Sequence, residues 1–237
     1  MNPAYSVILP VRNEEKNVEH VAKSYAAINR RIPIEVIFVE DGGSRDDTRG
    51  VLRRLAKTHP FIKPLFISKR GYGVSIREGL KTAKGEFVCW THADMQTDPK
   101  DTLTAYRLIT ARADKKECLV KGKRKGRPIA DVFFTIGMAA FETILLGKTL
   151  WDINAQPNMF HRNQIKMIEQ APSDFAFDLY VYYIFKSRKM PVVRFPVLFT
   201  KRLHGTSNWN VSLSAKWRFI KRTMSFSMRM KKSLASR

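Results

Sequence analysis

The stretch W-T-H-A-D-M-Q-T-D-P at residues 90–99 combines an imidazole, a carboxylate and an amide. His92, Asp94 and Gln96 are spaced two residues apart, which places their side chains on one face wherever the chain is extended. Carboxylate and amide oxygens are ligands that Mg²⁺ and Mn²⁺ prefer, and Mn²⁺ also tolerates an imidazole nitrogen. The stretch therefore predicts a divalent metal site that would offset the charge developing on a leaving diphosphate. For His92, capping of the next turn is the alternative interpretation.

Strand-like and helical segments alternate over the first half of the chain. Strands are predicted at Tyr5–Val11, Ile34–Val39, Phe61–Ile67, Glu86–Trp90 and Cys118–Gly122, and helical periodicity follows each of the first four. This alternation is typical of an α/β protein with a parallel sheet and helices on both faces. Ligands of such sheets bind at the carboxyl ends of the strands. The polar clusters Pro10–Glu14, Asp41–Ser44 and His92–Gln96 each follow a predicted strand, so we expect them at one edge of the sheet.

The second half of the chain changes character. We predict, in chain order, an apolar helix at Asp131–Gly147, an irregular polar segment at Trp151–Phe160, a helix at Asp174–Lys189, a strand at Val192–Thr200 and a loop at Lys201–Asn210. No internal repeat or low-complexity linker separates this half from the first. The two halves are therefore expected to share one domain.

Positive charge is concentrated towards the end of the chain. The formal net charge is +22, and no acidic side chain follows Asp178. Such a surface binds an anionic partner: nucleic acid, an anionic membrane or a phosphorylated substrate. Residues 211–232 have the pattern of a basic amphipathic helix, with a stripe formed by Leu213, Trp217, Ile220 and Met224. This helix either lies on an anionic membrane surface or packs on its own domain with its basic face in solvent.

Composition narrows the class of protein. A chain of 237 residues with 44% hydrophobic side chains can bury a sizeable core. Cys89 and Cys118 both lie in apolar runs, which predicts buried thiols in a reducing compartment rather than a disulfide framework. The first residues do not have the layout of a secretory signal. No run of 18 apolar residues occurs, so no membrane span is expected.

Several short motifs occur in a fixed order. They are Pro10-Val-Arg-Asn-Glu14, Val39-Glu-Asp-Gly-Gly-Ser-Arg-Asp-Asp-Thr48, Gly71-Tyr-Gly73, Ala83-Lys-Gly-Glu86 and His92-Ala-Asp94. Over about residues 5–210, this ordered set resembles family 2 glycosyltransferases of the GT-A fold, particularly the dolichyl-phosphate mannose synthase-like branch. The resemblance implies a GT-A domain at residues 1–210, with a mostly parallel central sheet flanked by helices, and a basic tail at 211–237. It also implies transfer of a sugar from a nucleoside diphosphate donor with inversion at the anomeric carbon.

The resemblance also implies roles for individual residues. His92, Asp94 and Gln96 fall on the D-x-D-x-Q positions that hold the metal, Mn²⁺ or Mg²⁺. Lys121-Gly-Lys-Arg124 resembles a G-x-R element whose arginine faces phosphate, and Arg127 is a second candidate for this role. Arg202-Leu-His-Gly-Thr-Ser207 resembles the R-x-x-G-x-S loop that closes over donor and metal. The positions expected at the donor are Pro10, Glu14, Asp41, Gly71, Arg124, Arg202 and Ser207.

The acceptor side requires a group that accepts a proton if the acceptor is a sugar hydroxyl, whereas a lipid phosphate attacks as an anion. Asp152, in the segment Trp151-Asp-Ile-Asn154, is placed by the resemblance as the acceptor-side acid. Asp178 is the second candidate. The alternative interpretations are a turn residue for Asp152 and a buried partner of an arginine for Asp178.

The sequence departs from the family pattern in three ways. His92 replaces the first aspartate of D-x-D, which weakens the metal site or changes its preference. Asp41-Gly-Gly-Ser44 replaces D-D-G-S, so the choice of nucleobase is open. Relatives that act on polyprenyl phosphate often carry membrane spans after this domain, and none is expected here. The Q-x-x-R-W signature of processive synthases is also missing, so one sugar per acceptor is expected.

Three candidate functions are weighed against these observations. The first is an inverting glycosyltransferase of cell-surface polysaccharide synthesis at the cytoplasmic membrane face, acting on polyprenyl phosphate or a lipid-linked glycan, with no nucleic acid as partner. The second is a nucleic-acid-binding protein, which explains the charge but not the three polar clusters. The third is a sugar nucleotidyltransferase, which is disfavoured because no glycine-rich loop follows the first predicted strand.

Overall fold

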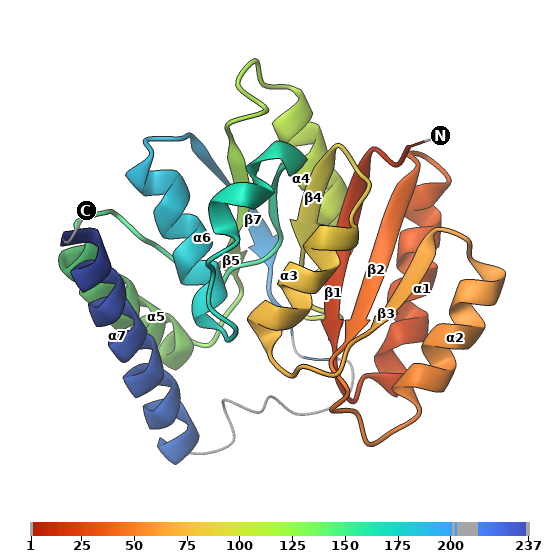
Figure 1. The fold of residues 1–237 in the computed structure, drawn as a ribbon, viewed down its shortest axis with the longest axis horizontal. Coiled ribbons are helices and arrows are strands. Elements are labelled where there is room, and N and C mark those ends of the chain that lie inside the picture. Colours follow the sequence, from red (N-terminus) through yellow and green to blue (C-terminus); the bar gives the residue numbers. More distant parts are fainter. Residues whose placement is uncertain (1, 201, 203–212, 236–237) are drawn as a thin grey trace.

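The computed structural model describes residues 2–200, 202 and 213–235, and its strands form one sheet (Figure 1). The strands are β1 Tyr5–Val11, β2 Ile34–Glu40, β3 Ile62–Phe66, β4 Phe87–Trp90, β5 Leu119–Lys125, β6 Asn158–His161 and β7 Val192–Leu198. The helices are α1 Glu15–Asn29, α2 Thr48–Thr58, α3 Tyr72–Thr82, α4 Lys100–Thr110, α5 Ile129–Leu146, α6 Ala176–Ser187 and α7 Leu213–Ala235, with a 3₁₀ helix η1 at Arg162–Ile168. The predicted α/β architecture is confirmed.

The strand order explains where the polar clusters lie. The sheet has the order β3-β2-β1-β4-β6-β5-β7. Strand β1 is parallel to both β2 and β4, and β2 is parallel to β3. The carboxyl ends of β1, β2 and β4 are therefore adjacent at one edge, as the sequence predicts.

Strand β6 corrects one prediction. The segment Trp151–Phe160 was expected to be irregular, but Asn158–His161 forms a strand that is antiparallel to both β4 and β5. All four of its residues are buried. A strand this short shows neither alternation nor a long apolar run, because its stability comes from its two neighbours in the sheet rather than from its own pattern.

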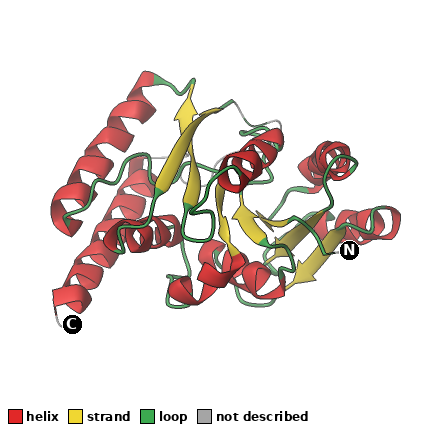
Figure 2. Ribbon diagram, turned by 90° about the horizontal axis from the view of Figure 1, so that it is seen from above, coloured by secondary structure: helices red, strands yellow, loops and turns green. Residues whose placement is uncertain are grey.

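Helices cover both faces of the sheet (Figure 2). On one face, α1, α2 and α4 pack against Val7 and Leu9 of β1. On the other face, α3 and α6 pack in the same core cluster as Ile8. Because both faces are buried, β1 is mostly apolar instead of alternating, and its one polar residue, Ser6, is buried and donates a hydrogen bond to Glu35. Cys89 and Cys118 are free and buried within this core, as expected.

Helices α5 and α7 lie side by side at the end of the molecule away from α1 and α2 (Figure 1). Both were predicted as helices from the sequence. Glu142 of α5 is fully buried, and its carboxyl group lies near the hydroxyl of Ser227 on α7. No helix in the described ranges is long and apolar enough to cross a bilayer.

The buried Glu142 carboxyl makes stability depend on pH. Burial raises the pKa of Glu142 to about 7. Between about pH 4.5 and that value the folded protein holds a proton that the unfolded chain has lost, so stability falls as pH rises through this window. Relative to Glu142→Gln, the wild-type free energy of unfolding is expected to fall by on the order of 2 kcal/mol between about pH 5 and about pH 8. Urea unfolding at both pH values measures this difference.

The matched control is Glu19→Gln, which changes an exposed carboxylate of α1. This variant is expected to keep the wild-type pH dependence. Parallel pH dependences for the wild type and Glu142→Gln would contradict the expected role of Glu142.

Candidate active site

The loops after β1 and β2 form one connected platform. The side-chain Oδ1 of Asn13 accepts a hydrogen bond from the Arg45 backbone N–H at 2.8 Å. The Glu14 backbone N–H donates to Thr48 Oγ1 at 3.0 Å. Asn13 has a left-handed backbone, with φ of 56°, a conformation that asparagine tolerates better than most residues. Pro10 is half-buried in β1, opposite Val39 of β2.

Asp41 links this platform to the next loop. Its carboxylate accepts hydrogen bonds from the backbone N–H groups of Gly43, at 3.1 Å, and Gly71, at 3.2 Å. The neighbouring Glu40 is fully buried and forms an ion pair with Arg49. Burial opposes ionisation of Glu40, but hydrogen bonds from Arg49 and Ser44 outweigh it and lower its pKa. Sequence reasoning missed Glu40, although an acidic residue that ends an apolar strand is a usable signal.

Gly71 and Gly73 allow the start of α3 to approach another loop closely. The Gly73 N–H donates to the carbonyl oxygen of Ser173 at 3.0 Å. A Cβ atom at position 73 would lie 2.2 Å from the carbonyl oxygen of Pro172. Gly71 has φ of 140°, which L-residues rarely adopt. The Gly71-Tyr-Gly73 motif therefore serves close backbone packing beside Asp41.

Gly73→Ala is expected to lower the free energy of unfolding by about 1–3 kcal/mol, because the new methyl group displaces backbone atoms. Urea or thermal unfolding measures the loss. The matched control is Gly137→Ala in α5, where an added Cβ would meet no atom within 4 Å. That variant is expected to be as stable as the wild type or slightly more stable. A Gly73→Ala protein with wild-type stability would contradict this packing.

The segment that carries His92, Asp94 and Gln96 is bent. Residues 93–97 form a series of bends, and Met95 has φ of 59°. The expectation of an extended chain with three side chains on one face is therefore wrong here, because a left-handed residue interrupts the alternation. The three side chains also have different surroundings. The His92 ring lies 5.7 Å from the Tyr72 ring, and Gln96 Nε2 donates to the Thr200 carbonyl at 3.2 Å.

Asp94 lies at the centre of a small charge cluster. It is 3% exposed, and its Oδ1 accepts a hydrogen bond from the Gln96 N–H at 3.1 Å. Its Oδ2 lies 2.9 Å from Arg202 Nη2, and Arg202 Nη1 lies 4.0 Å from Glu14 Oε1. Burial and the nearby Asp94 charge raise the pKa of Glu14. The structure thus brings Glu14, Asp94 and Arg202 together, whereas Ser207 lies outside the described residues.

The donor set of this cluster fits a hard cation. Among the described residues, no group of three or more His, Cys, Asp and Glu side chains is arranged to hold a metal. However, the Arg202 guanidinium bridges the carboxylates of Asp94 and Glu14, with one Nη atom near each, so a cation already lies between them. Such a position favours positive charge. Mg²⁺ commonly uses one or two carboxylates and takes its other ligands from water and phosphate oxygens, so these two side chains suffice.

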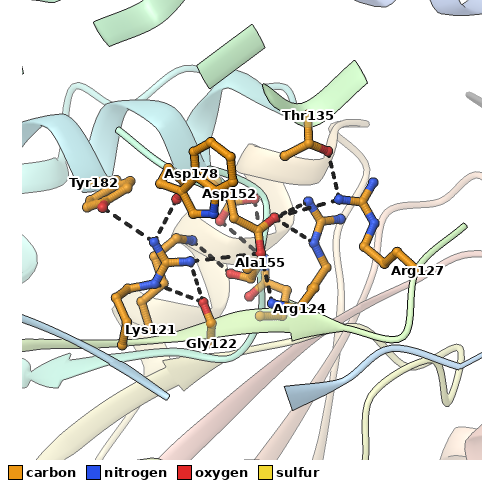
Figure 3. Close-up of polar contacts among 12 residues, drawn as sticks. Lys121, Gly122, Arg124, Arg127, Thr135, Asp152, Ala155, Asp178 and Tyr182 are labelled. Carbon is orange, nitrogen blue, oxygen red and sulfur yellow. Dashed lines mark hydrogen bonds and ion pairs between the residues drawn. The ribbon is translucent and has the colours of Figure 1, made fainter. Parts of the chain in front are cut away.

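Asp152 is held by arginines at the other side of the site (Figure 3). It accepts hydrogen bonds from the Arg124 backbone N–H and Arg124 Nε, both at 2.8 Å, and forms an ion pair with the Arg124 guanidinium. Arg127 Nη1 and Arg194 Nη2 each lie 3.9 Å from its carboxylate. Burial opposes ionisation, but the charge and hydrogen bonds of Arg124 lower the pKa of Asp152. The carboxylate is therefore ionised and fixed in orientation.

Two further basic residues lie beneath Asp152. Lys121 is fully buried, and its Nζ donates to the Ala155 carbonyl at 2.7 Å and to Asn158 Oδ1 at 2.8 Å. Burial lowers the pKa of Lys121 to about 7. The Arg194 guanidinium donates to the Gly122 carbonyl at 2.7 Å. The sequence contained no signal for Arg194, because a lone arginine in an edge strand is normally a solvent-exposed residue.

Asp178 connects the two sides of the site. Its carboxylate accepts hydrogen bonds from Trp90 Nε1 at 2.8 Å, Tyr72 hydroxyl at 3.0 Å and Gln156 Nε2 at 3.2 Å. No arginine is among its hydrogen-bond partners in the described residues, so the interpretation as an arginine partner is not supported. Tyr72 in turn stacks on Phe175, with ring centroids 4.6 Å apart. Burial and the Asp178 charge raise the pKa of Tyr72, which keeps its hydroxyl protonated as a donor.

The fold is shared with solved GT-A glycosyltransferases. Glucosyl-3-phosphoglycerate synthase from Mycobacterium tuberculosis, crystallised with Mn²⁺, UDP and glucosyl-3-phosphoglycerate, aligns with a TM-score of 0.72 at 15% identity, over 97% of this chain and 80% of that one. A mannosyltransferase from Pyrobaculum calidifontis, crystallised with GDP-Man and Mn²⁺, aligns with a TM-score of 0.62 at 21% identity, over 87% and 59% of the two chains. The expected GT-A fold is confirmed.

The sequence comparison defines the family. The pattern of Glycosyl transferase family 2 matches residues 6–127, more than half of the chain. The protein therefore belongs to glycosyl transferase family 2, as its ordered motifs predicted.

Curated relatives match about two fifths of the chain. Undecaprenyl-phosphate 4-deoxy-4-formamido-L-arabinose transferase of Pseudomonas savastanoi pv. phaseolicola is 29% identical over 102 residues, which cover 40% of this chain and 29% of that protein. Bactoprenol glucosyl transferase of Shigella phage SfV is 30% identical over 101 residues, which cover 41% of this chain and 32% of that protein. The matched segment thus spans about a third of each relative's length or less. These comparisons give no support to the nucleic-acid alternative.

Proposed function

We propose that this protein transfers one sugar from a nucleoside diphosphate donor to polyprenyl phosphate or a lipid-linked glycan, with inversion at the anomeric carbon, in cell-surface glycan synthesis. The observation that carries this proposal is the pair of carboxylates, Asp94 and Glu14, at the carboxyl ends of β4 and β1, where the fold binds ligands. The names of the curated relatives support a lipid-phosphate acceptor.

On the donor side, the platform of the β1 and β2 loops binds the nucleotide. Pro10 and Glu14 line its pocket, and Asp41 accepts hydrogen bonds from the nucleobase or ribose. Gly71 allows the backbone to approach Asp41 at 3.2 Å, which closes one end of the pocket. Arg202 and Ser207 would contact the bound donor. Arg202 would then exchange part of its contact with Asp94 for diphosphate oxygens, because guanidinium groups bind both anions.

Asp94 and Glu14 would hold a divalent metal, with Gln96 and His92 as further ligand candidates. The metal, Mn²⁺ or Mg²⁺, supplies Lewis-acid stabilisation of the departing diphosphate. Solved proteins of the same fold contain Mn²⁺. Asp94 is fixed for this role by its hydrogen bond from Gln96 N–H. Gln96 itself donates a hydrogen bond to the carbonyl of Thr200, two residues before Arg202 in the sequence.

On the acceptor side, Asp152 is the acid that orients the acceptor-binding arginines. Arg124, held by Asp152, presents its guanidinium towards the acceptor, and Arg127 lies within reach of the same carboxylate. A phosphate acceptor attacks as an anion and needs cationic positioning rather than a base. If the acceptor is a sugar hydroxyl, Asp152 is ionised and able to accept its proton.

The GT-A domain at residues 1–210 and the basic tail at 211–237 have separate tasks in this proposal. The tail binds the anionic surface of the membrane at its cytoplasmic face, where the lipid acceptor is reached. Exposed basic side chains of α7, such as Lys221 and Arg229, support this arrangement because each attracts anionic lipid.

Calorimetric titration of nucleotides tests the proposal. UDP, GDP, CDP and TDP would each be titrated with Mn²⁺, Mg²⁺ or a chelator. Metal-dependent binding of one diphosphate is expected and would identify the base of the donor. Binding that is independent of metal would keep the enzyme class and remove the metal role of Asp94. No binding to any nucleotide would contradict the proposed function.

A further inference from the structure

Helix α5 has an apolar face that the described part of the chain leaves uncovered. Among the side chains that the structure describes between positions 132 and 144, the exposed ones are all non-polar: Val132, Phe133, Ile136, Gly137, Ala140 and Ile144. At 3.6 residues per turn, these positions fall within one sector of about 140°. Phe133 is 69% exposed and Ile144 is 82% exposed. A continuous exposed apolar stripe of this kind marks an interaction surface rather than ordinary scattered exposure.

Helix α7, which lies beside α5, is basic. Every charged side chain described in α7 is cationic: Lys221, Arg222, Arg229, Lys231 and Lys232. Arg222 is paired with Asp174 at 3.0 Å, and the other four are exposed. An apolar stripe next to a basic helix matches the acyl chains and the anionic headgroups of a bilayer leaflet.

We propose that α5 is a membrane-docking helix. The large side chains of its stripe, Val132, Phe133, Ile136 and Ile144, enter the boundary between headgroups and acyl chains, while α7 contacts anionic headgroups. The stripe covers about 18 Å along the helix axis, which is too short to span a hydrocarbon core of about 30 Å, so α5 lies in the plane of the membrane. This proposal deepens the proposed function, since a lipid acceptor presents its reactive phosphate at that surface.

The position of α5 connects this surface to the candidate active site. Arg127 Nη1 donates to Thr135 Oγ1 of α5 at 2.7 Å. Arg124 lines a small cavity together with Met138 of α5, Leu179 of α6 and Thr223 of α7. Docking through α5 therefore places Arg124 and Arg127 near the headgroup layer, where they can meet an acceptor phosphate. The proposal thus assigns membrane insertion to α5, and only the electrostatic part of binding to the tail.

Vesicle sedimentation tests the docking helix. The probe is vesicles of phosphatidylcholine with about 30% phosphatidylglycerol, and the partition coefficient is measured for the full chain. The double variant Phe133→Asp/Ile144→Asp is expected to lose at least about tenfold in partition coefficient. The variant Phe133→Leu/Ile144→Leu is expected to retain it, because leucine is also apolar.

Two controls show whether weaker vesicle binding results from lost insertion, from the change in net charge or from misfolding. Lys23→Gln/Lys100→Gln lowers the net charge by the same amount at exposed positions of α1 and α4, and is expected to bind vesicles within about twofold of the wild type. Thermal unfolding of all variants is expected to match the wild type, because the changed side chains are exposed.

Undiminished vesicle binding by the aspartate variant, or no vesicle binding by the wild type, would overturn the proposal. Dimerisation of the wild type that the aspartate variant abolishes, without vesicle binding, would instead assign the stripe to a second copy of the chain. Nucleotide titration of the same variants distinguishes failure of the docking proposal from failure of the proposed function. Normal nucleotide binding without vesicle binding would refute only docking, and vesicle binding without nucleotide binding would refute only the transferase.

Discussion

Replacement of Asp94 by asparagine is expected to reduce sugar transfer by about 10²–10³-fold, the usual loss when an electrostatic group that acts on the leaving charge is removed. Asparagine keeps the size of the side chain and can still accept the Gln96 hydrogen bond. It removes the negative charge that attracts a divalent cation. The variant should therefore fold normally and lose metal-dependent nucleotide binding, which calorimetry with Mn²⁺ and with chelator measures.

The control for this change is Asp98→Asn, four residues along the same segment. Asp98 is exposed, and its carboxylate accepts a hydrogen bond from the Lys100 N–H at 2.8 Å, which an asparagine oxygen can also accept. This variant is expected to retain wild-type transfer. A fully active Asp94→Asn enzyme would refute the metal-binding role of the segment. If transfer is lost but metal-dependent nucleotide binding is unchanged, Asp94 acts on the sugar and does not bind the metal.

Replacement of Asp152 by alanine is expected to lower the free energy of unfolding by about 3–5 kcal/mol, because it removes the carboxylate that balances the charge of buried arginines. The Arg124 side chain is 11% exposed and that of Arg127 only 6%. Alanine at this position also has to adopt φ of 47°, which is unfavourable for a residue with a Cβ atom. Urea unfolding at neutral pH measures the loss. A loss below about 1 kcal/mol would show that solvent screens these arginines.

The variant Asp152→Asn separates stability from chemistry, because asparagine tolerates a left-handed backbone. If Asp152 acts by orienting Arg124, the KM for the acceptor should rise with a smaller effect on kcat, and Arg124→Gln/Asp152→Asn should lose little more than either single change. If it removes a proton from a hydroxyl, kcat should fall by about 10²–10⁴-fold. Asp114→Asn, which breaks the half-exposed pair with Arg112, is the control and should change neither parameter.

The sequence predicted the amino-terminal half well because that half follows strong local rules. Strands β1, β2 and β4 are almost entirely buried, so each reads as a mostly apolar run followed by polar residues. The order of β1, β2 and β4 then brings Glu14, Asp41 and Asp94 to one edge. The ordered motifs identified the same family that the comparison matches over residues 6–127. The apolar and basic periodicities also predicted α5 and α7.

The sequence by itself thus determined the fold class, the edge of the sheet that carries the site and the acidic residues there. Only the tertiary structure decided their partners. Strand β6, the pairing of Arg202 with Asp94 and the pairing of Arg124 with Asp152 all join residues at least 28 positions apart. Local propensity contains no information on such contacts, since they form only when distant segments pack together. For the same reason, the exposed stripe of α5 could not be distinguished from a core-facing stripe until its neighbours were in place.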